Sequence, residues 1–345
     1  MKTFPVLVGS VQLGGGAPVR IQSMTKCKTE NAKAVIKEIK TLEKAGCEIV
    51  RVAVPNLTAV QSISEIKSKI KIPLVADIHF DYQLAIESIK AGADKIRINP
   101  GNVGADYKVR EIIKAAKDKN IPIRVGTNAG SISKSILSKY KKPTVAAILD
   151  SIKDSLRIFE KEDYINIVLS AKTASPLETI EIYECLSNLY PYPLHIGVTE
   201  AGLPFEGAIR STAALSVLLN KGIGDTIRVS LTGPSVLEVA AAKEILSSLD
   251  KRKFGPTLIS CPTCGRCEVN LEKIAKQVAK ELKKITVPIK VAVMGCVVNG
   301  PGEAKAADYG IACGKKSGII FKQGKIIKKC KKNNLVTEMM RIIKG

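Results

Sequence analysis

Short runs of β-branched and other apolar residues alternate with longer amphipathic stretches between residues 18 and 249. The runs are 18–23, 48–54, 73–78, 95–99, 122–127, 165–171, 193–199 and 226–231. The stretches between them have apolar residues at helical spacing, as at Val35, Ile39 and Leu42. That helix is expected to end at Gly46, where a left-handed cap favours glycine. The pattern predicts parallel strands that alternate with helices.

Eight β–α units in roughly 230 residues are typical of a (β/α)8 barrel. A doubly wound sheet usually has fewer strands and a glycine fingerprint after the first one. Here the first predicted strand leads into SMTKCKTEN, which is no such fingerprint. We therefore predict an α/β protein: a TIM barrel over residues 1–250 with an N-terminal hairpin, followed by a small α/β domain over residues 255–345.

Several predicted strands have one arginine embedded among apolar neighbours. The segments GCEIVRVAV, GADKIRINP and GDTIRVSL form a weak internal repeat with this feature. In the first of them Val50 and Val52 must face the surrounding helices, so period-two alternation turns Arg51 inward. The same alternation predicts further inward cations at Arg97, Arg124, Lys172 and Arg228.

Two acidic residues, Asp77 and Glu200, occupy the ends of the third and seventh predicted strands. Barrel active sites lie at these strand ends. Five inward cations and two acids leave three positive charges without a partner, and an unpaired buried ion costs several kcal/mol. A phosphorylated or diphosphorylated small molecule is therefore the predicted ligand. Neutral hydrogen bonds to it are expected from Asn99, Asn128, Thr199 and Ser230.

Nine cysteines occur in the chain, and four of them lie within residues 261–296. The N-terminus lacks the apolar region of a signal peptide, and no apolar run is long enough for a membrane helix. We therefore expect a cytoplasmic protein without membrane contact, whose cysteines are thiols or metal ligands. The two histidines, His79 and His195, lie far from the cysteine cluster, so neither is expected to bind metal.

The motif CPTCGRC places Cys261 and Cys264 at the spacing of two thiolates on one metal centre, and Cys296 follows a predicted strand at 288–294. A zinc ribbon would need a second cysteine pair or a histidine after it. Cys267 extends the motif to the ferredoxin-like C-x2-C-x2-C. A helix over 268–284 is expected to begin at once, so we set Cys267 aside and predict an iron–sulfur cluster.

The loop GCVVNGPGE contains a single carboxylate, Glu303, which is the predicted fourth ligand. Its glycines let backbone amides approach cluster sulfides. A hard oxygen ligand would be displaceable, which suits a cluster that binds substrate directly. A last hairpin is predicted over 309–328, with its turn at Gln323 and Gly324.

The net charge of +22 suggests nucleic acid as a partner. However, most lysines fall on the polar faces of predicted helices, and aromatic residues make up only 4%. No segment interleaves basic and stacking residues, so no nucleic-acid partner is expected. The tail at 315–345 has ten Lys or Arg residues and one Glu, and it could steer an acidic protein partner.

The motifs together resemble one enzyme family, the 4-hydroxy-3-methylbut-2-enyl diphosphate synthases of the non-mevalonate isoprenoid pathway. The matching segments are SMT, RVAVP, ADIHF, KIRINPGN, IRVGTNAGS, SAKTAS, HIGVTEAG, TIRVSLTG, SCPTCGR and MGCVVNGPGEA. The resemblance implies a [4Fe–4S] cluster on Cys261, Cys264, Cys296 and Glu303. It also implies diphosphate binding by Arg51, Arg97, Arg124, Asn128, Lys172, Arg228 and Ser230, with Asp77, Thr199 and Glu200 facing the substrate.

The reaction implied by the resemblance is reductive opening of 2-C-methyl-D-erythritol 2,4-cyclodiphosphate to 4-hydroxy-3-methylbut-2-enyl diphosphate. Glu200 is the expected proton donor to the departing oxygen. The family also implies a ferredoxin or flavodoxin as electron donor, and a head-to-tail homodimer whose active site is shared between chains. Only a few residues separate Leu249 from Cys261, which indicates the two-domain bacterial type.

Two other classes of protein fit parts of the sequence. A zinc-ribbon nucleic-acid-binding protein would explain the cysteine pair and the charge, but not the inward arginines. A pterin-type barrel enzyme with a structural metal module would explain the barrel and the anion site, but not MGCVVNGPGE.

Overall fold

The computed structural model describes residues 2–296 and 304–345, except residues 129, 131 and 133. The chain divides into two compact units, residues 1–252 and 253–345. Among the helices described, none is long and apolar enough to cross a membrane.

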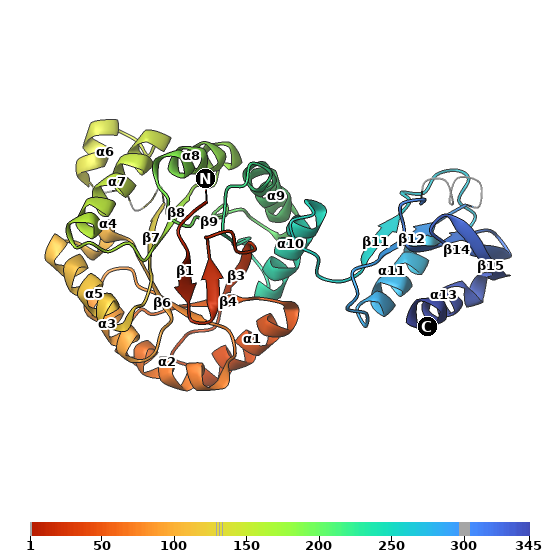
Figure 1. Ribbon diagram of the computed structural model, residues 1–345, viewed down its shortest axis with the longest axis horizontal. Coiled ribbons are helices and arrows are strands. Elements are labelled where there is room, and N and C mark those ends of the chain that lie inside the picture. Colours follow the sequence, from red (N-terminus) through yellow and green to blue (C-terminus); the bar gives the residue numbers. More distant parts are fainter. Residues whose placement is uncertain (1, 129, 131, 133, 297–303) are drawn as a thin grey trace. The chain divides into compact units, whose positions relative to one another are not determined.

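The first unit is built on eight parallel strands that form a ring (Figure 1). They are β3 (Arg20–Met24), β4 (Ile49–Ala53), β5 (Leu74–Asp77), β6 (Lys95–Ile98), β7 (Ile123–Asn128), β8 (Ile167–Lys172), β9 (His195–Ile196) and β10 (Thr226–Ile227). Their order is β8-β7-β6-β5-β4-β3-β10-β9, and a bridge between Leu169 and Leu194 joins the two ends. The predicted (β/α)8 barrel is confirmed.

Helices surround this ring in Figure 1. They are α1 (Ala32–Ala45), α2 (Leu57–Lys69), α3 (Tyr82–Lys90), α4 (Pro100–Val103), α5 (Asp106–Lys119), α6 (Lys134–Tyr140), α7 (Val145–Lys161), α8 (Pro176–Leu189), α9 (Pro204–Asn220) and α10 (Ser235–Ser248). Helix α1 illustrates why they form. The Asn31 side chain accepts a hydrogen bond from the Ala34 amide, and α1 ends at Gly46 in the left-handed conformation (φ 99°), as predicted.

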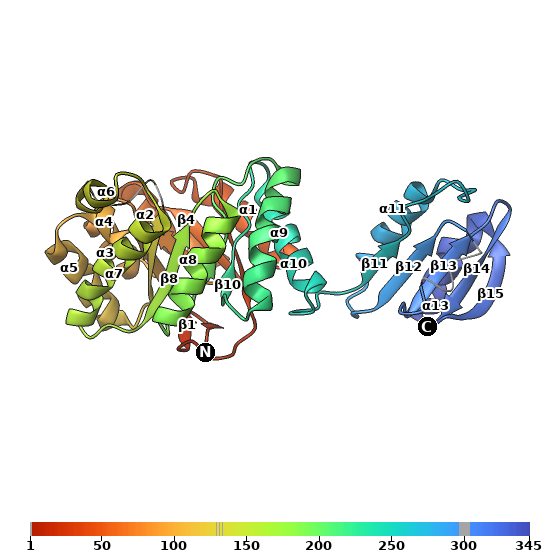
Figure 2. The same cartoon turned by 90° about the horizontal axis from the view of Figure 1, so that it is seen from above.

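An N-terminal hairpin, β1 (Val6–Val8) and β2 (Val11–Leu13), lies at one end of the barrel (Figure 2). Its buried side chains pack on strand residues inside the barrel. The cluster comprises Val6, Val8, Leu13, Ile49, Val75 and Val168. Because Ile49, Val75 and Val168 lie near the starts of their strands, this apolar floor covers the N-terminal end. The polar interior residues lie beyond it, toward the C-terminal strand ends.

In its described residues, the second unit is a five-stranded sheet with the helices α11 and α13 (Figure 2). The strands are β11 (Thr257–Ser260), β12 (Lys290–Met294), β13 (Tyr309–Cys313), β14 (Ser317–Lys322) and β15 (Lys325–Lys331), and the helices are α11 (Leu271–Leu282) and α13 (Leu335–Lys344), which follows a short 3-10 turn at Lys332–Asn334. Strands β11, β12 and β13 are parallel, whereas β14 and β15 are antiparallel to their neighbours. Both helices pack into one apolar cluster with β12, β13 and β14.

The prediction of one last hairpin over 309–328 is wrong in part. The segment forms the three strands β13, β14 and β15, with turns after Cys313 and at Gln323–Gly324. The second turn lies where it was predicted, and both of its residues have positive φ (48° and 76°). The first turn is closed by a hydrogen bond from the Gly314 amide to the Ser317 carbonyl (2.9 Å). A single glycine before two lysines did not signal it.

Candidate functional site

The C-terminal ends of the barrel strands surround a cavity of about 260 Å³. Its predicted site residues are Arg51, Asp77, Arg97, Arg124, Asn128, Lys172, Thr199, Arg228 and Ser230. Period-two alternation explains this placement. In β4, for example, the buried residues Val50 and Val52 flank Arg51, which reaches the cavity from the other face of the strand.

Asp77 is the carboxylate on the β5 side of the cavity. Its oxygens lie 3.0 Å from Arg97 Nη1, 3.6 Å from Arg51 Nε and 3.5 Å from His79 Nε2. Burial favours the neutral acid, but Arg51, the His79 hydrogen bond and Arg97 outweigh it and hold the pKa of Asp77 well below its usual range. Asp77 is therefore ionised, and it acts as the counter-ion of two arginines rather than as an acid near neutral pH.

Three cations of the barrel interior, two of them buried and Lys172 half-buried, have no such counter-ion. Among the residues that the structure describes, Arg124, Lys172 and Lys95 have no carboxylate within ion-pair distance. The Nε and Nη1 atoms of Arg124 and the Nζ atom of Lys95 also have no hydrogen-bond partner there. Burial, together with repulsion from neighbouring cations, lowers the pKa of all three side chains well below the ordinary values. The barrel interior therefore has an excess of positive charge, which an anionic ligand would neutralise.

Lys172 is held at the end of β8 by neighbours on β9. Its Nζ atom lies 3.3 Å from Nε2 of His195, a fully buried ring whose pKa is lowered well below 6.5 by burial and by Lys172. His195 is therefore neutral. A side chain at Gly197 would place its Cβ 2.3 Å from the Arg228 carbonyl oxygen and 3.0 Å from Lys172 Nζ. Only a glycine at position 197 lets the backbone at Arg228, just after β10, lie so close to it.

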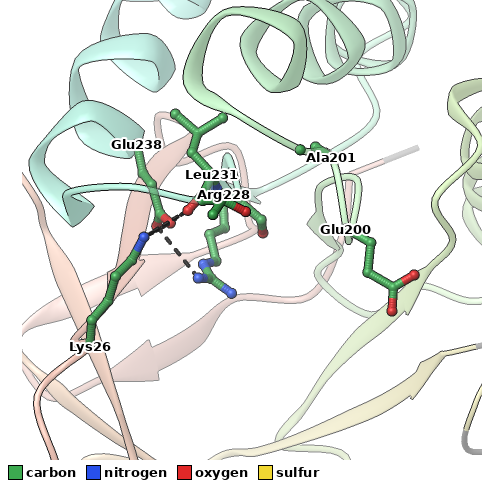
Figure 3. Close-up of a pocket in the computed structure, with 9 residues that line it drawn as sticks. Lys26, Glu200, Ala201, Arg228, Leu231 and Glu238 are labelled. Atoms are coloured by element: carbon green, nitrogen blue, oxygen red, sulfur yellow. Dashed lines mark hydrogen bonds and ion pairs between the residues drawn. The ribbon is translucent and has the colours of Figure 1, made fainter.

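A second cavity of about 400 Å³ adjoins the first, and Arg228 and Ser230 line both (Figure 3). Its buried carboxylate is Glu238 of α10, which is 1% exposed. Glu238 lies 3.5 Å from Arg228 Nη2 and 3.3 Å from Lys26 Nζ, and it accepts a hydrogen bond from Ser23 Oγ (3.0 Å). Glu238, not Glu200, is the acid that pairs with Arg228, as Asp77 pairs with Arg51 and Arg97.

Glu200 lines this second cavity but takes no part in the ion pairs drawn there. None of the dashed lines in Figure 3 reaches it, and its side chain lies apart from Lys26 and Glu238. Its φ of 54° is unusual for a residue other than glycine. Backbone strain of this kind is concentrated at functional sites, where the surrounding structure holds it in place.

Several residues of the site were not predicted from the sequence. Met24 Sδ lies 3.1 Å from Arg51 Nε, and His79 Nε2 lies 3.2 Å from Arg97 Nη1. Met24 is two residues after the buried Gln22 of β3, and His79 is two residues after Asp77, so alternation was an available signal for both. Glu238 is the lone acid in the apolar segment SVLEVAAA, which was the only sign of a buried carboxylate.

The cysteine loops lie together at one end of the small sheet. Cys261 follows β11 and Cys296 lies two residues after β12, and these strands are parallel neighbours with Ser260 opposite Val293. The Gly295 amide donates a hydrogen bond to Cys261 Sγ (3.4 Å). A Cβ atom at Gly295 would lie 2.6 Å from Cys267 Sγ, so a side chain there would fill the space between the two loops.

The remaining predicted ligands are placed less closely. Cys264 is exposed and Cys296 is half-buried, whereas Cys267 Sγ donates to the Val269 carbonyl (3.3 Å). Within the described ranges, no three His, Cys, Asp or Glu side chains are grouped closely enough to hold a metal ion. Glu303 lies outside the described residues. Thiols on two adjacent loops, with a glycine amide directed at one sulfur, are a donor set that fits an iron–sulfur cluster.

The fold and the site define a class: a (β/α)8-barrel protein with a cation-lined mouth, joined to a small α/β domain with paired cysteine loops. Residues 3–243 match the GcpE TIM-barrel domain, and residues 257–345 match the GcpE protein C-terminal domain. The chain belongs to the GcpE family.

Relatives match nearly the whole length of the chain. The 4-hydroxy-3-methylbut-2-en-1-yl diphosphate synthase (flavodoxin) of Thermodesulfovibrio yellowstonii is 54% identical over 343 residues, which are 99% of this chain and 98% of the relative. The enzyme of the same description from Fusobacterium nucleatum is 51% identical, and the match covers 99% of this chain and 96% of that protein. The family resemblance that the motifs predicted is confirmed.

The barrel also resembles a solved structure of another function. Dihydropteroate synthase of Xanthomonas albilineans has a TM-score of 0.50 with 12% sequence identity, and the match covers 72% of this chain and 98% of that one. At this identity the likeness concerns the fold alone.

Because the charge of Arg124 is unpaired, we expect that removing this side chain stabilises the ligand-free protein. Replacing Arg124 with methionine removes a buried cation that has no carboxylate partner, and should therefore raise the free energy of unfolding by about 1 kcal/mol or more. The variant should also lose most of the thermal stabilisation that inorganic pyrophosphate gives to the parent protein. Urea unfolding and thermal scans with and without pyrophosphate measure both effects.

Glu238→Gln is the matched control, because it removes a buried carboxylate and leaves Arg228 and Lys26 without their counter-ion. It should lower the free energy of unfolding by about 3–5 kcal/mol. If Arg124→Met instead destabilised the ligand-free protein as much as Glu238→Gln does, the view of Arg124 as an uncompensated charge would be wrong.

Proposed function

We propose that the chain catalyses the reductive ring opening and dehydroxylation of 2-C-methyl-D-erythritol 2,4-cyclodiphosphate to 4-hydroxy-3-methylbut-2-enyl diphosphate. Two electrons and two protons enter, and two C–O bonds break. One break opens the ring and leaves its oxygen, with one proton, on the diphosphate; the other releases the hydroxyl group, which takes the second proton and leaves as water. The observation that carries the proposal is the set of buried cations without carboxylate partners at the barrel mouth, which suits a diphosphate. The names of the full-length relatives support the same reaction.

The diphosphate is bound by the cations of the mouth. Arg51, Arg97, Arg124, Lys172 and Arg228 surround one cavity, with Asn128, Thr199 and Ser230 as neutral hydrogen-bonding groups. Ligand oxygens would give Arg124 and Lys172 the partners that the ligand-free protein lacks. Asp77 faces the substrate as an ionised acid and holds two of the arginines in position.

The small domain supplies the redox centre. Cys261, Cys264 and Cys296 would hold a [4Fe–4S] cluster, with Glu303 as its fourth, oxygen ligand. The hydrogen bond from the Gly295 amide to Cys261 Sγ supports this, because backbone amides directed at sulfur stabilise reduced clusters. Cys267, which bonds a backbone carbonyl, is not a ligand. When bound, the cluster delivers the two electrons one at a time.

Glu200 is the proton donor to the departing oxygen. It lines the cavity that shares Arg228 and Ser230 with the diphosphate site, so its carboxyl group belongs to the same reaction space. Its strained backbone supports a role beyond packing.

Two partners complete the enzyme. The electron donor is a flavodoxin, named in the description of the relatives, or a ferredoxin with the same role. The functional unit is a head-to-tail homodimer, in which the cluster domain of one chain serves the barrel of the other. A barrel and a cluster domain that form separate compact units within one chain suit such sharing.

Purification under anaerobic conditions, or reconstitution with iron and sulfide, tests the redox centre. The protein should be brown, with about four iron and four sulfide per chain, and reduced flavodoxin should support turnover of the cyclodiphosphate. Serine in place of Cys261, Cys264 or Cys296 should abolish turnover and lower the iron content, whereas Cys267→Ser should retain both. A colourless protein with one zinc per chain, or loss of the cluster in the Cys267 variant alone, would contradict the assignment.

The role of Glu200 is tested by Glu200→Gln, which keeps the size of the side chain but cannot donate a carboxylic proton. The value of kcat should fall about 100-fold or more, with an unaltered cluster spectrum. Glu206→Gln, at an exposed acid in the first turn of the neighbouring helix α9, should change kcat little. Full turnover by the Glu200 variant would refute the role.

Sharing of the site between chains is tested by mixing two inactive variants, Cys296→Ala and Arg124→Ala. Each mixed dimer contains one intact barrel served by one intact cluster domain. Random exchange of chains should restore about a quarter of the parent activity. If the mixture stays inactive while size-exclusion chromatography of tagged chains shows that they exchange, the shared site is excluded.

A further inference from the structure

The fold of the small domain brings part of its lysine-rich tail to the cysteine loops. The parallel strands β11, β12 and β13 all end at the edge of the sheet from which those loops leave. Strand β14 runs the opposite way and begins at that edge, where Ser317 pairs with Lys331 of β15. The turn before β14 and the end of β15 therefore lie at the cysteine end of the sheet. Four lysines there, Lys315, Lys316, Lys331 and Lys332, form what we call the lysine rim.

Backbone hydrogen bonds tie the lysine rim together and to the cysteine loop. The Lys332 amide donates to the Lys316 carbonyl (3.2 Å), which joins the two halves of the rim. The Lys315 amide donates to Glu268 Oε2 (3.1 Å), the residue next to Cys267. The pKa of Cys313 also reflects how close the rim lies to the cysteine loop. Burial and the nearby Cys267 raise the pKa of the Cys313 thiol to about 11, and Lys332 opposes them.

No carboxylate in the described part of the domain neutralises the charges of the lysine rim. Lys315, Lys316 and Lys331 are exposed, and in the described part of the chain no rim lysine has a carboxylate within ion-pair distance. Three other lysines of the domain, Lys276, Lys284 and Lys328, do have such a partner. Lys328, of the same strand β15, lies 2.6 Å from Glu338. Among the described residues, the acid beside the rim is Glu268, whose Oε2 atom accepts the Lys315 amide rather than pairing with an ammonium group. The positive field at the cysteine end therefore faces solvent.

We propose that the lysine rim is the surface on which the electron donor, a flavodoxin with an acidic surface around its flavin, docks. This inference rests on the proposed function, because it needs a redox centre at the cysteine loops. Each docking passes one electron from the reduced flavin to the centre and leaves a flavin oxidised by one electron. Two dockings supply the two electrons of one turnover.

The chemistry of the surface suits a transient electron-transfer complex. Such complexes bury little area and depend on complementary charge for their association rate rather than for great affinity. The ammonium groups of the lysine rim, beside the redox centre, would steer an acidic partner to a position from which the electron-transfer distance is short. Screening by salt should weaken it strongly, since the charges are exposed.

The test compares two double variants that change the net charge by the same amount. Lys315→Glu with Lys331→Glu reverses charge on the lysine rim. Lys305→Glu with Lys325→Glu is the matched control at the opposite end of the sheet, where Lys305 lies against the β14–β15 turn and Lys325 begins β15. Both are made in the cluster-loaded enzyme.

The rim variant should lower kcat/KM for reduced flavodoxin about 10-fold or more at low salt, and it should weaken the binding of oxidised flavodoxin in calorimetry to a similar degree. The control should stay within about twofold of the parent in both measurements. Turnover driven by dithionite-reduced methyl viologen, a small donor that needs no docking surface, should be equal in all three proteins.

Three outcomes would overturn the inference. Equal losses of kcat/KM and of flavodoxin binding in the rim and control variants would show that net charge matters and the position of the lysines does not. Unchanged flavodoxin binding and turnover in the rim variant would exclude the surface. Absence of viologen-driven turnover in the loaded parent enzyme would refute the proposed function itself, and with it the reason for a donor site.

Discussion

The rest of the barrel depends on an excess of buried positive charge at its mouth. Asp77 balances Arg51 and Arg97, and Glu238 balances Arg228 together with Lys26. The structure keeps further cations there without a counter-ion and tolerates the electrostatic cost, because burial and repulsion oppose their charged forms. Such a site is unfavourable for the empty protein and favourable for a multivalent anion. Binding and stability are opposed at these positions, as they commonly are at functional sites.

The apolar parts of the barrel make this charge tolerable. The N-terminal hairpin covers the N-terminal end of the strands with the aliphatic floor around Ile49, Val75 and Val168, so the cations are held above a packed layer. Gly197 lets β10 approach beside Lys172, and the neutral His195 occupies the space next to that lysine. The cations therefore hold fixed positions before any ligand arrives, which reduces the reorganisation needed on binding.

In the small domain the positive charges lie at the surface rather than in the interior. Its core of aliphatic residues from α11, α13 and the middle strands is buried, and its lysines lie at the surface, where a single charge contributes little to stability. The direction of the strands decides where these exposed charges gather. Because β14 and β15 reverse direction, lysines from separate parts of the tail meet at the cysteine end of one sheet. In our proposal, the mouth of the barrel binds a small anion, whereas the lysine rim attracts a large one.

The sequence by itself determined the features that follow from local periodicity. Alternation within a strand is a property of neighbouring residues, so the inward positions of Arg51, Arg97 and Arg124 and the eight-stranded barrel were predictable. Only the tertiary structure decided which acids meet these arginines. Glu238 reaches Arg228 because α10 packs against β3, whereas Glu200 remains apart from the ion pairs although it follows a barrel strand. Contacts between segments far apart in the chain depend on packing and strand register, which no local pattern records.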